Sequence, residues 1–402
     1  MGQRESTVRC YERALAALDR AELSDPAYDV RRERAFVLRQ MSARVLHTDP
    51  GRARQLAERS LELCRALGDR REIADSLFAL GSALRSQGAL VEAQRLFEKS
   101  VSLRRALGDR LGMLEPLHSV NYALANLDRI EQAERMAREA VAIAQQLGGP
   151  VLVGWANYGL GYVLRYAGRF AQARSLVESS LASFREWGHR EAEAWGLWSL
   201  GWTAEHLGSY EEARAAMEAA LARFQESGLR IQAANCYVEL GHLALAEGAY
   251  GAAQEWLQQS TAIYQKSGGL RWRASEALAA LAYVARGLDQ SAQARQHLGA
   301  ALRIAAEHHA YNTVLHALPA VALLLMDGGR GLRQPDVEQA VELYTLASRH
   351  PFVANSRWFE DVAGCEIAAA AESLPRDVVI RAQERGRARD LWATVDELLA
   401  ER

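Results

Sequence analysis

The sequence predicts an all-α fold, a right-handed superhelical solenoid of antiparallel helix pairs, and three observations support this. The same residues recur every 40 positions, and apolar residues recur at helical spacing between them. Alternating β-branched runs bounded by turns, which would predict strands, do not occur. A repeat of this length buries its apolar face against neighbouring copies, so the units are expected to stack in order along the chain.

Glycine marks the repeat at two places. One set begins each unit and a second follows twenty residues later, where Asp128 replaces glycine in one unit and Gly287 takes its place in the unit from 268. Glycine readily adopts the left-handed conformation that ends a helix. Each unit should therefore hold two helices, A and B, joined by tight turns. The first set is Gly68, Gly108, Gly148, Gly188, Gly228 and Gly268, and the second is Gly88, Gly168, Gly208 and Gly248.

Small residues also recur in the middle of the predicted helices. Mid-helix glycine costs about 1 kcal/mol relative to alanine, so its recurrence indicates that helices A and B approach each other closely. The glycines stand thirteen residues into a unit and the alanines twenty-five, with Ala294 one residue late in the unit from 268. They are Gly81, Gly161, Gly201 and Gly241, and Ala93, Ala133, Ala173, Ala213 and Ala253.

The repeats divide the chain into three parts. Residues 1–27 are predicted to form an N-terminal helix, which would be a truncated repeat if its partner is missing. Residues 28–349 form about eight repeats, the last of them degenerate with an insertion at 327–336. Residues 350–402 break the period and are predicted to form a helical cap. The repeats start at residues 28, 68, 108, 148, 188, 228, 268 and 308.

The pattern of Leu-Gly, then Gly, then Ala resembles the tetratricopeptide repeat (TPR). It departs from the standard form because its period is 40 rather than about 34 residues and because the proline that usually closes helix B is missing. Both departures, with the "ALGDR" linkers and the tail, resemble the MalT-like sensor regions of bacterial STAND signalling ATPases and large regulators. The resemblance implies a non-enzymatic sensor module that binds a peptide, protein or small ligand, with any nucleotide-binding or effector domain outside this chain.

Composition and motifs narrow the function classes. The net charge is −2 and no apolar run is long enough to cross a bilayer, so neither nucleic acid nor membrane is an expected partner. The four cysteines are far apart, and the chain starts without a signal-peptide pattern, so we expect a cytoplasmic protein with free thiols. The two lysines, Lys99 and Lys266, follow no glycine-rich loop, so no P-loop is present.

We expect no enzyme, no cofactor and no metal site. HExxH and CxxC motifs are missing, and the adjacent His308 and His309 would point to different sides of a helix. Glu205 and His206 are interpreted as part of a solvated surface. A buried pair of a histidine and a carboxylate at His206 or His242 would reopen the enzyme class.

The candidate binding site comes from the repeat register. In the unit from 188, Trp195, Trp198 and Trp202 stand seven, ten and fourteen residues in, on a helical stripe distinct from the packing positions. The resemblance to TPR arrays implies that these positions face the concave groove. Aromatic rings with a few polar tips suit a binding surface. The candidate ligand-binding residues are His118, Tyr122, Asn126, Trp155, Tyr158, Tyr162, Arg165, Tyr166, Trp195, Trp198, Trp202, Glu205, His206, Asn235 and His242.

Two alternatives stay open for this aromatic patch. Its rings could simply fill the space between neighbouring units. The chain could instead be a structural scaffold or oligomerisation module whose patch is buried against another protein. The leading hypothesis is ligand or partner binding, because other units manage with Ser, Ala and Leu at the same positions.

Overall fold

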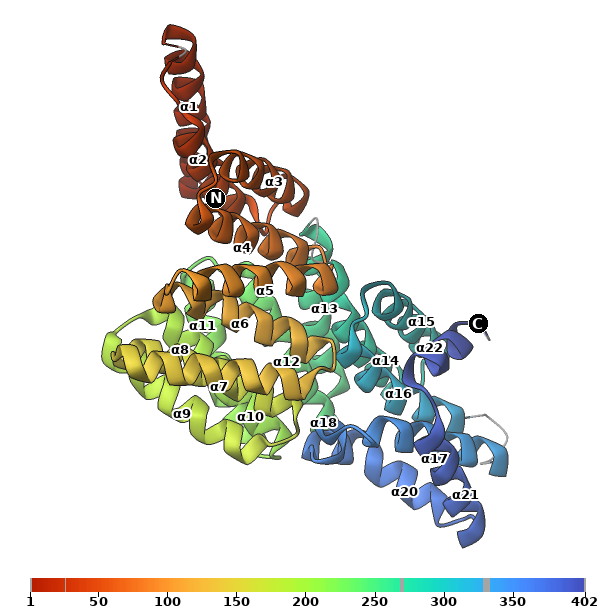
Figure 1. The fold of residues 1–402 in the computed structure, drawn as a ribbon. Coiled ribbons are helices and arrows are strands. Elements are labelled where there is room, and N and C mark those ends of the chain that lie inside the picture. Colours follow the sequence, from red (N-terminus) through yellow and green to blue (C-terminus); the bar gives the residue numbers. More distant parts are fainter. Residues whose placement is uncertain (1, 26, 268–270, 328–332, 401–402) are drawn as a thin grey trace. The chain divides into compact units, whose positions relative to one another are not determined.

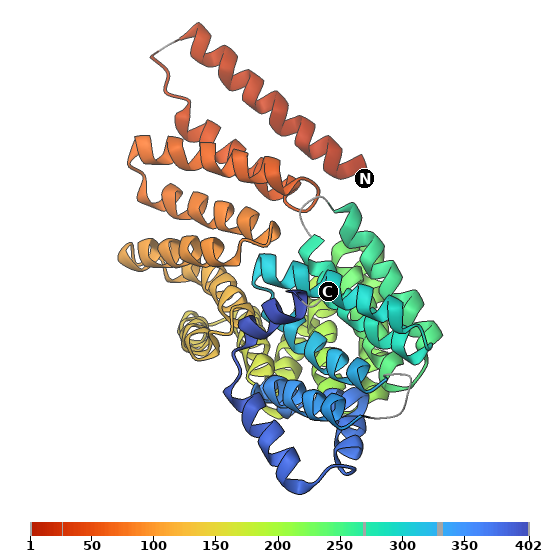
Figure 2. The same cartoon turned by 90° about the vertical axis from the view of Figure 1, so that its right-hand side faces the viewer.

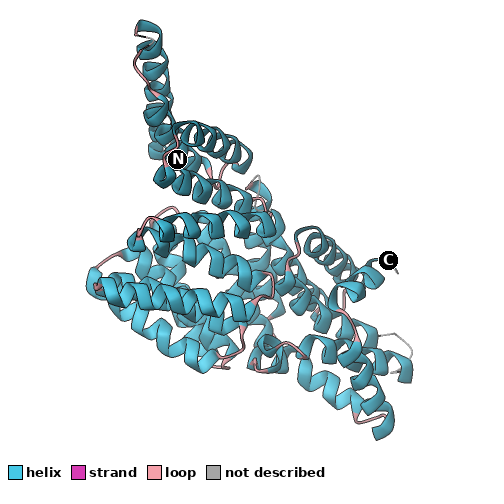
Figure 3. Ribbon diagram, in the orientation of Figure 1, coloured by secondary structure: helices cyan, strands magenta, loops and turns pink. Residues whose placement is uncertain are grey.

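The computed structural model describes residues 2–25, 27–267, 271–327 and 333–400 (Figure 1). Helices joined by short loops make up these ranges, and none of their residues lies in a strand (Figure 3). No helix within them is long and apolar enough to cross a membrane. Gly268 and most of the insertion expected at 327–336 lie outside the described residues.

The chain divides into two compact units, of which the first comprises Met1–Leu147 with Ser267–Arg271. Its N-terminal helix packs on the first of three helix pairs, and within each pair the two helices are in contact. These elements are α1 (Gly2–Ser24), and the pairs α2 (Arg31–Val45) with α3 (Pro50–Leu67), α4 (Arg70–Ser86) with α5 (Leu90–Ala106), and α6 (Arg110–Asn126) with α7 (Ile130–Leu147).

The second unit comprises Gly148–Lys266 and Trp272–Arg402, and it begins with five further pairs. These are α8 (Pro150–Tyr166) with α9 (Phe170–Trp187), α10 (Arg190–His206) with α11 (Tyr210–Glu226), α12 (Arg230–Ala246) with α13 (Tyr250–Lys266), α14 (Ala274–Gly287) with α15 (Ser291–His308), and α16 (Tyr311–Met326) with α17 (Gln334–Ser348). A 3₁₀ turn, η1 (Arg271–Arg273), leads into α14. The helix pairs confirm an all-α solenoid, whereas the domain boundaries at 27 and 349 stay a prediction.

The predicted turn glycines adopt left-handed backbone conformations, with one correction. Every described member of the two glycine sets has a positive φ, and Asp128 takes the same conformation with a φ of 58°. Gly287 does not fill this role, because it is the last residue of α14 and the left-handed residue is Asp289, with a φ of 59°. The unit from 268 therefore gains one residue before this turn, and the fully buried Ala294 follows the same shift.

The mid-helix glycines lie where helices A and B touch, as predicted. A Cβ atom on Gly201 would stand 2.9 Å from the backbone oxygen of Ala213, and one on Gly241 would stand 2.6 Å from Leu257 Cγ. The recurring alanines of helix B are fully buried opposite them. The glycine of helix A and the alanine of helix B are therefore both needed for the two helices to approach closely.

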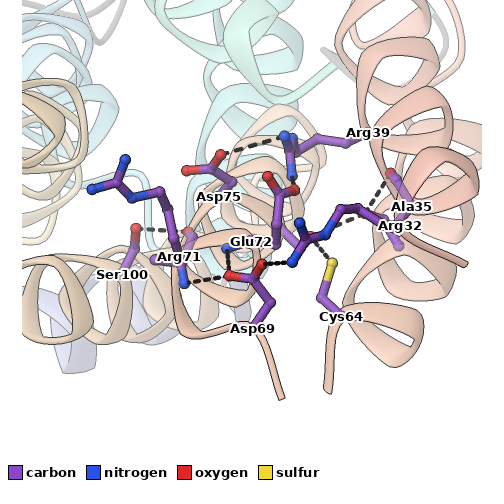
Figure 4. A network of polar contacts seen from close by, with 12 residues as sticks. Arg32, Ala35, Arg39, Cys64, Asp69, Arg71, Glu72, Asp75 and Ser100 are labelled. Atoms are coloured by element: carbon purple, nitrogen blue, oxygen red, sulfur yellow. Dashed lines mark hydrogen bonds and ion pairs between the residues drawn. The ribbon is translucent and has the colours of Figure 1, made fainter. Parts of the chain in front are cut away.

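Buried serines of helix B donate hydrogen bonds to the backbone of the helix A in the same pair. Ser60 donates to the carbonyl oxygen of Ala35, and Ser100 donates to that of Ala74, each over 2.8 Å (Figure 4). The recurrence of this bond 40 residues apart shows that the repeat preserves polar contacts as well as apolar ones.

The described residues from 351 to 400 form six short elements within the second unit. Helices α20 (Cys365–Ala371) and α21 (Arg376–Ala388) pack on α17, and α22 (Leu391–Ala400) packs on α15. The preceding elements are α18 (Pro351–Ala354), α19 (Arg357–Phe359) and a π-helical turn, η2 (Glu360–Gly364). They contact α8, α10, α12 and α16, which are all helices A (Figures 1 and 2). The start of this region therefore lies on the helices that carry most of the candidate site.

Candidate binding site

The aromatic residues of α8 and α10 form one continuous surface. Trp155 packs edge-on against Tyr158, and Tyr158 against Trp195, with ring centroids 5.7 and 6.4 Å apart. Farther along the same helices, Tyr166 lies 5.7 Å from Trp202. The sequence register thus placed the rings of two adjacent helices A correctly beside one another. Whether they bind a ligand stays a prediction.

Arg165 lies inside this surface and forms no ion pair with a carboxylate of the described residues. Its guanidinium carbon is 4.2 Å from the ring centre of Trp202 and 5.2 Å from those of Tyr162 and Trp198. The side chain is fully buried, and its Nη1 donates a hydrogen bond to the carbonyl oxygen of Ser199 over 3.4 Å. Burial lowers the pKa of Arg165. Because Nε and Nη2 make no hydrogen bond, an anionic group placed here would satisfy two buried donors.

The chain's own residues 351–359 cover one end of the aromatic surface. Phe352 stacks on Trp202 and on Tyr166, both with centroids 5.6 Å apart, and it lies 4.9 Å from His206. Only 2% of Phe352 is exposed. We call residues 351–359 the inserted segment. A terminal cap would pack only on the last repeat, whereas the inserted segment packs on helices that come nearly 200 residues earlier in the chain.

Directional hydrogen bonds hold the inserted segment in place. Ser356 Oγ and His206 Nδ1 share a bond of 2.6 Å, and the indole Nε1 of Trp358 donates to the carbonyl oxygen of His242 over 2.8 Å. Asn355 Nδ2 donates to the carbonyl oxygen of Gly168 over 3.3 Å. These bonds specify one register for the segment, since apolar contacts alone would tolerate sliding.

A cluster of histidines and glutamates lies beneath the inserted segment, and it corrects the expectation of a solvated surface at Glu205 and His206. Glu205 is 0% exposed and His206 1% exposed. His242 is equally buried, and its Nδ1 lies 3.4 Å from Glu205 Oε1 and 3.5 Å from Glu239 Oε2. The buried pair of a histidine and a carboxylate that would reopen the enzyme class is therefore present at His242.

Burial and mutual charge set the protonation of this cluster. Burial raises the pKa of Glu205 and raises that of Glu239 to about 7. Burial alone would lower the pKa of His242, but the two carboxylates beside it raise it to about 10. Burial, reinforced by the charge on His242, lowers the pKa of His206 and His316 well below their usual range. At neutral pH the cluster thus holds positive charge on His242 and keeps the other two histidines neutral.

The remaining candidates are placed differently. Asn235 on α12 accepts a hydrogen bond from the hydroxyl of Tyr264 over 2.5 Å, so its amide oxygen already has a partner within the unit. His118, Tyr122 and Asn126 lie on α6 of the first unit, and the other twelve candidates lie in the second. On α6, Asn126 Nδ2 donates to the carbonyl oxygen of Tyr122.

Several residues of this region were missed from the sequence. The sequence predicts Phe352, Ser356 and Trp358 only as parts of the cap, because the inserted segment lies outside the repeat register. Glu239 and His316 also lie on helices A, but at positions of the repeat other than those from which the candidate site was drawn. The spacing Glu239-x-x-His242, which puts both side chains on one helix face, is the signal that could have found the cluster.

A long array of antiparallel helix pairs with side chains gathered on helices A defines an α-solenoid of the kind that presents an extended binding surface. The family model for the tetratricopeptide repeat matches residues 48–106, 117–186, 152–226 and 192–266, together more than half of the chain. The chain belongs to the tetratricopeptide repeat family.

Solved structures show the same fold at low sequence identity. A Rap protein in complex with Competence and Sporulation Factor has a TM-score of 0.60 and 13% identity, over 92% of this chain and 99% of that one. The apo form of RapI has a TM-score of 0.54 and 14% identity, over 64% of this chain and 92% of that one. No curated protein sequence matches the chain significantly.

Proposed function

We propose that this chain is a non-enzymatic binding protein that recognises a segment of a partner polypeptide on the aromatic surface of α8, α10 and α12. One observation carries the proposal: the inserted segment already lies on this surface as a polypeptide ligand would. Phe352 packs on the ring of Trp202 and Trp358 on that of His242, and Ser356 and Asn355 supply directional hydrogen bonds. The surface thus has the chemistry to hold an aromatic-bearing segment.

In this proposal the inserted segment masks the site that a partner would use. A partner segment that displaced Phe352 would uncover Trp202 and, beside it, Arg165 with its two unsatisfied donors. An acidic group on the partner would satisfy them, whereas the inserted segment does not. The partner would therefore gain a charge-assisted hydrogen bond that the chain's own segment lacks.

Two further considerations support a signalling role. A Rap protein of the same fold holds Competence and Sporulation Factor in its complex. The 40-residue period and the tail resemble sensor regions of STAND-type signalling proteins, so we propose that partner binding is read out by a domain attached to this chain. Release of the inserted segment would be the conformational change that such a domain senses.

The test uses a fluorescent peptide with the sequence of residues 350–364, "HPFVANSRWFEDVAG". The full-length wild type should bind it weakly, because the tethered copy competes at high effective concentration. The Phe352→Ala variant should bind it at least about tenfold more tightly, since its own segment fits less well. Fluorescence anisotropy gives both affinities, and a peptide with alanine in place of Phe352 and Trp358 is the matched probe.

Ile380→Ala provides a control variant, because Ile380 is 44% exposed in the same C-terminal region. It should bind the peptide as the wild type does. If the Phe352→Ala protein keeps its helical circular dichroism but binds no peptide, the surface does not recognise segments and the proposal is wrong. The scaffold alternative instead expects a stable homodimer that buries Trp155 and Trp195, which light scattering after size exclusion would detect.

A further inference from the structure

Three side chains from two adjacent helices A converge beneath the inserted segment. Glu205 comes from α10, and Glu239 and His242 come from successive turns of α12. One donor atom of each lies within 4.8 Å of the donor atoms of the other two. All three side chains are at least nine-tenths buried, at 0%, 5% and 1% exposure respectively.

These contacts do not have the geometry of hydrogen bonds. His242 Nδ1 is 3.4 Å from Glu205 Oε1 and 3.5 Å from Glu239 Oε2, beyond the usual 2.7–3.2 Å of an N–H···O bond. Neither oxygen of Glu205, neither nitrogen of His242 and not Oε2 of Glu239 makes a hydrogen bond within the described chain. Both carboxylates are balanced only by the charge on His242, so a cation that displaced the proton of this imidazole would satisfy several of these atoms together.

The separations fit ligands around a common ion. Two donor atoms, each about 2.1 Å from a tetrahedral zinc ion, lie about 3.4 Å apart. Two carboxylates and a neutral imidazole around a divalent cation also carry no net charge, which removes the electrostatic cost of burial. Glu-x-x-His pairs on helices that face one another are a known way to build metal sites in helical bundles.

We propose that Glu205, Glu239 and His242 bind one divalent transition-metal ion of the zinc class. The mixed nitrogen and oxygen donors and the absence of cysteine from the cluster match this class, and the spacing favours tetrahedral over octahedral coordination. Three protein ligands leave a fourth position for water or another ligand. This proposal departs from the expectation, drawn from sequence, that the chain binds no metal.

The inserted segment closes over the proposed site. The Trp358 ring lies 4.8 Å from His242 and 5.4 Å from His316, and its indole nitrogen bonds the backbone of His242. Bound metal would fix the His242 ring against Trp358, so metal occupancy and docking of the inserted segment should stabilise each other. The site thus goes beyond segment recognition and would make it metal-dependent.

A second set of possible metal ligands shares His242, and it allows the choice of Glu205 and Glu239 as ligands to be tested. His316 Nε2 lies 3.5 Å from Glu276 Oε1, and His242, Glu276 and His316 also have donor atoms within 4.8 Å of one another. Glu276 keeps a third of its side chain exposed and so can meet water, unlike Glu205. We therefore place the ion in the fully buried set, and Glu276→Gln serves as the variant that separates the two.

The experiment titrates full-length, untagged, chelator-treated protein with Zn²⁺ by calorimetry and with Co²⁺ by visible absorption. We expect one ion per chain, a tetrahedral Co²⁺ spectrum and a higher thermal unfolding temperature in the presence of Zn²⁺. Glu205→Gln and Glu239→Gln should each weaken binding by more than about 100-fold, because removing a ligand costs more than removing its outer-shell support.

Glu191→Gln is the matched control, because Glu191 is an exposed residue of the same helix as Glu205, and it should bind as the wild type does. Circular dichroism of each variant separates loss of a ligand from loss of the fold. Binding that survives Glu205→Gln but is lost in Glu276→Gln would overturn the assignment to the buried set. Failure of the folded wild-type protein to bind either metal would overturn the site altogether, leaving segment recognition to be judged by the peptide titration.

Discussion

The helices A of the two units differ in the side chains they carry beside the shared packing positions. In the first unit, residues of α2 form ion pairs with residues at the start of α4 and just before it: Arg32 with Asp69, and Arg39 with Glu72 and Asp75 (Figure 4). In the second unit, α8, α10 and α12 carry aromatic rings, a buried arginine and a buried cluster of acids and histidines. The glycines and alanines where helices A and B touch recur in both units, so the side chains outside these contacts are free to differ.

The comparison separates the residues that make the fold from those that make the site. Glycines and alanines at fixed register build both units. A charged residue at a groove position costs little folding free energy while water can solvate the charge. The same position covered by the inserted segment must be apolar, fully hydrogen-bonded or occupied by a ligand. The second unit is therefore where substitutions should have the larger consequences.

Trp358→Ala should have the largest effect on stability. The side chain is 0% exposed and packs on His242, Tyr283 and Phe359. Removing it leaves a cavity and should cost about 3–5 kcal/mol of unfolding free energy in the second unit. Urea denaturation followed by circular dichroism measures this. Trp187→Ala, at a residue 48% exposed, should cost less than about 1 kcal/mol, and equal losses would show that the inserted segment is not well packed.

The fold could be predicted from sequence because its determinants are local and periodic. Gly201 and Ala213 mark a helix contact whose small residues recur in several units, and the turn glycines mark their own left-handed backbone conformation. The prediction failed at Gly287, where the period shifts by one residue and the side chain of an aspartate tolerates the left-handed conformation instead. A repeat pattern thus locates turns only while its length stays constant.

The candidate site was predictable only in part. The register correctly put Tyr158 beside Trp195, but it treated Glu205 as solvated because its cover comes from a segment more than 140 residues later. Nothing in the periodicity of the array indicates where a non-repeating tail will pack. Long-range insertion is therefore what separates the observed site from the predicted one.

Gly201→Ala should be the next most damaging change, and Gly81→Ala in the first unit should cost less. A methyl group on Gly201 would meet the backbone oxygen of Ala213, which cannot move without shifting α11. On Gly81 it would meet the buried ring of Phe97, where a side chain rather than the backbone of α5 would have to move. We expect about 2–3 kcal/mol for Gly201→Ala and about 1–2 kcal/mol for Gly81→Ala. Gly251→Ala, with open space around it, should be neutral or stabilising. A larger loss at Gly251 than at Gly201 would contradict the close-contact explanation.

Acid should weaken both units, and His118 in the first unit and His350 in the second each contribute to this loss. Burial lowers the pKa of His350 and of His118 to about 4, further assisted by Arg349 and Arg85 respectively. Between about pH 6.5 and 4 the unfolded chain binds these protons and the folded chain does not, so stability is lost as the pH falls through this window. Because both side chains are only partly buried, we expect about 1 kcal/mol from each. His350→Gln and His118→Gln should each flatten the pH dependence of unfolding measured in urea, and an unchanged slope would refute the shift at that residue.

The smallest effect should come from an exposed ion pair of the first unit. Arg32 is 67% exposed, and its bond to Asp69 spans 2.7 Å at the surface, so Arg32→Ala should change the unfolding free energy by less than about 0.5 kcal/mol. Arg39, only 12% exposed, contacts both Glu72 and Asp75, and Arg39→Ala should cost about 1–2 kcal/mol because it removes the cation beside Glu72 and leaves Asp75 to Arg104. Denaturation at low and high salt distinguishes them, since added salt screens the exposed pair more completely. If Arg32→Ala proved as costly as Arg39→Ala, the first unit would depend on its surface charges as strongly as the second depends on its buried ones.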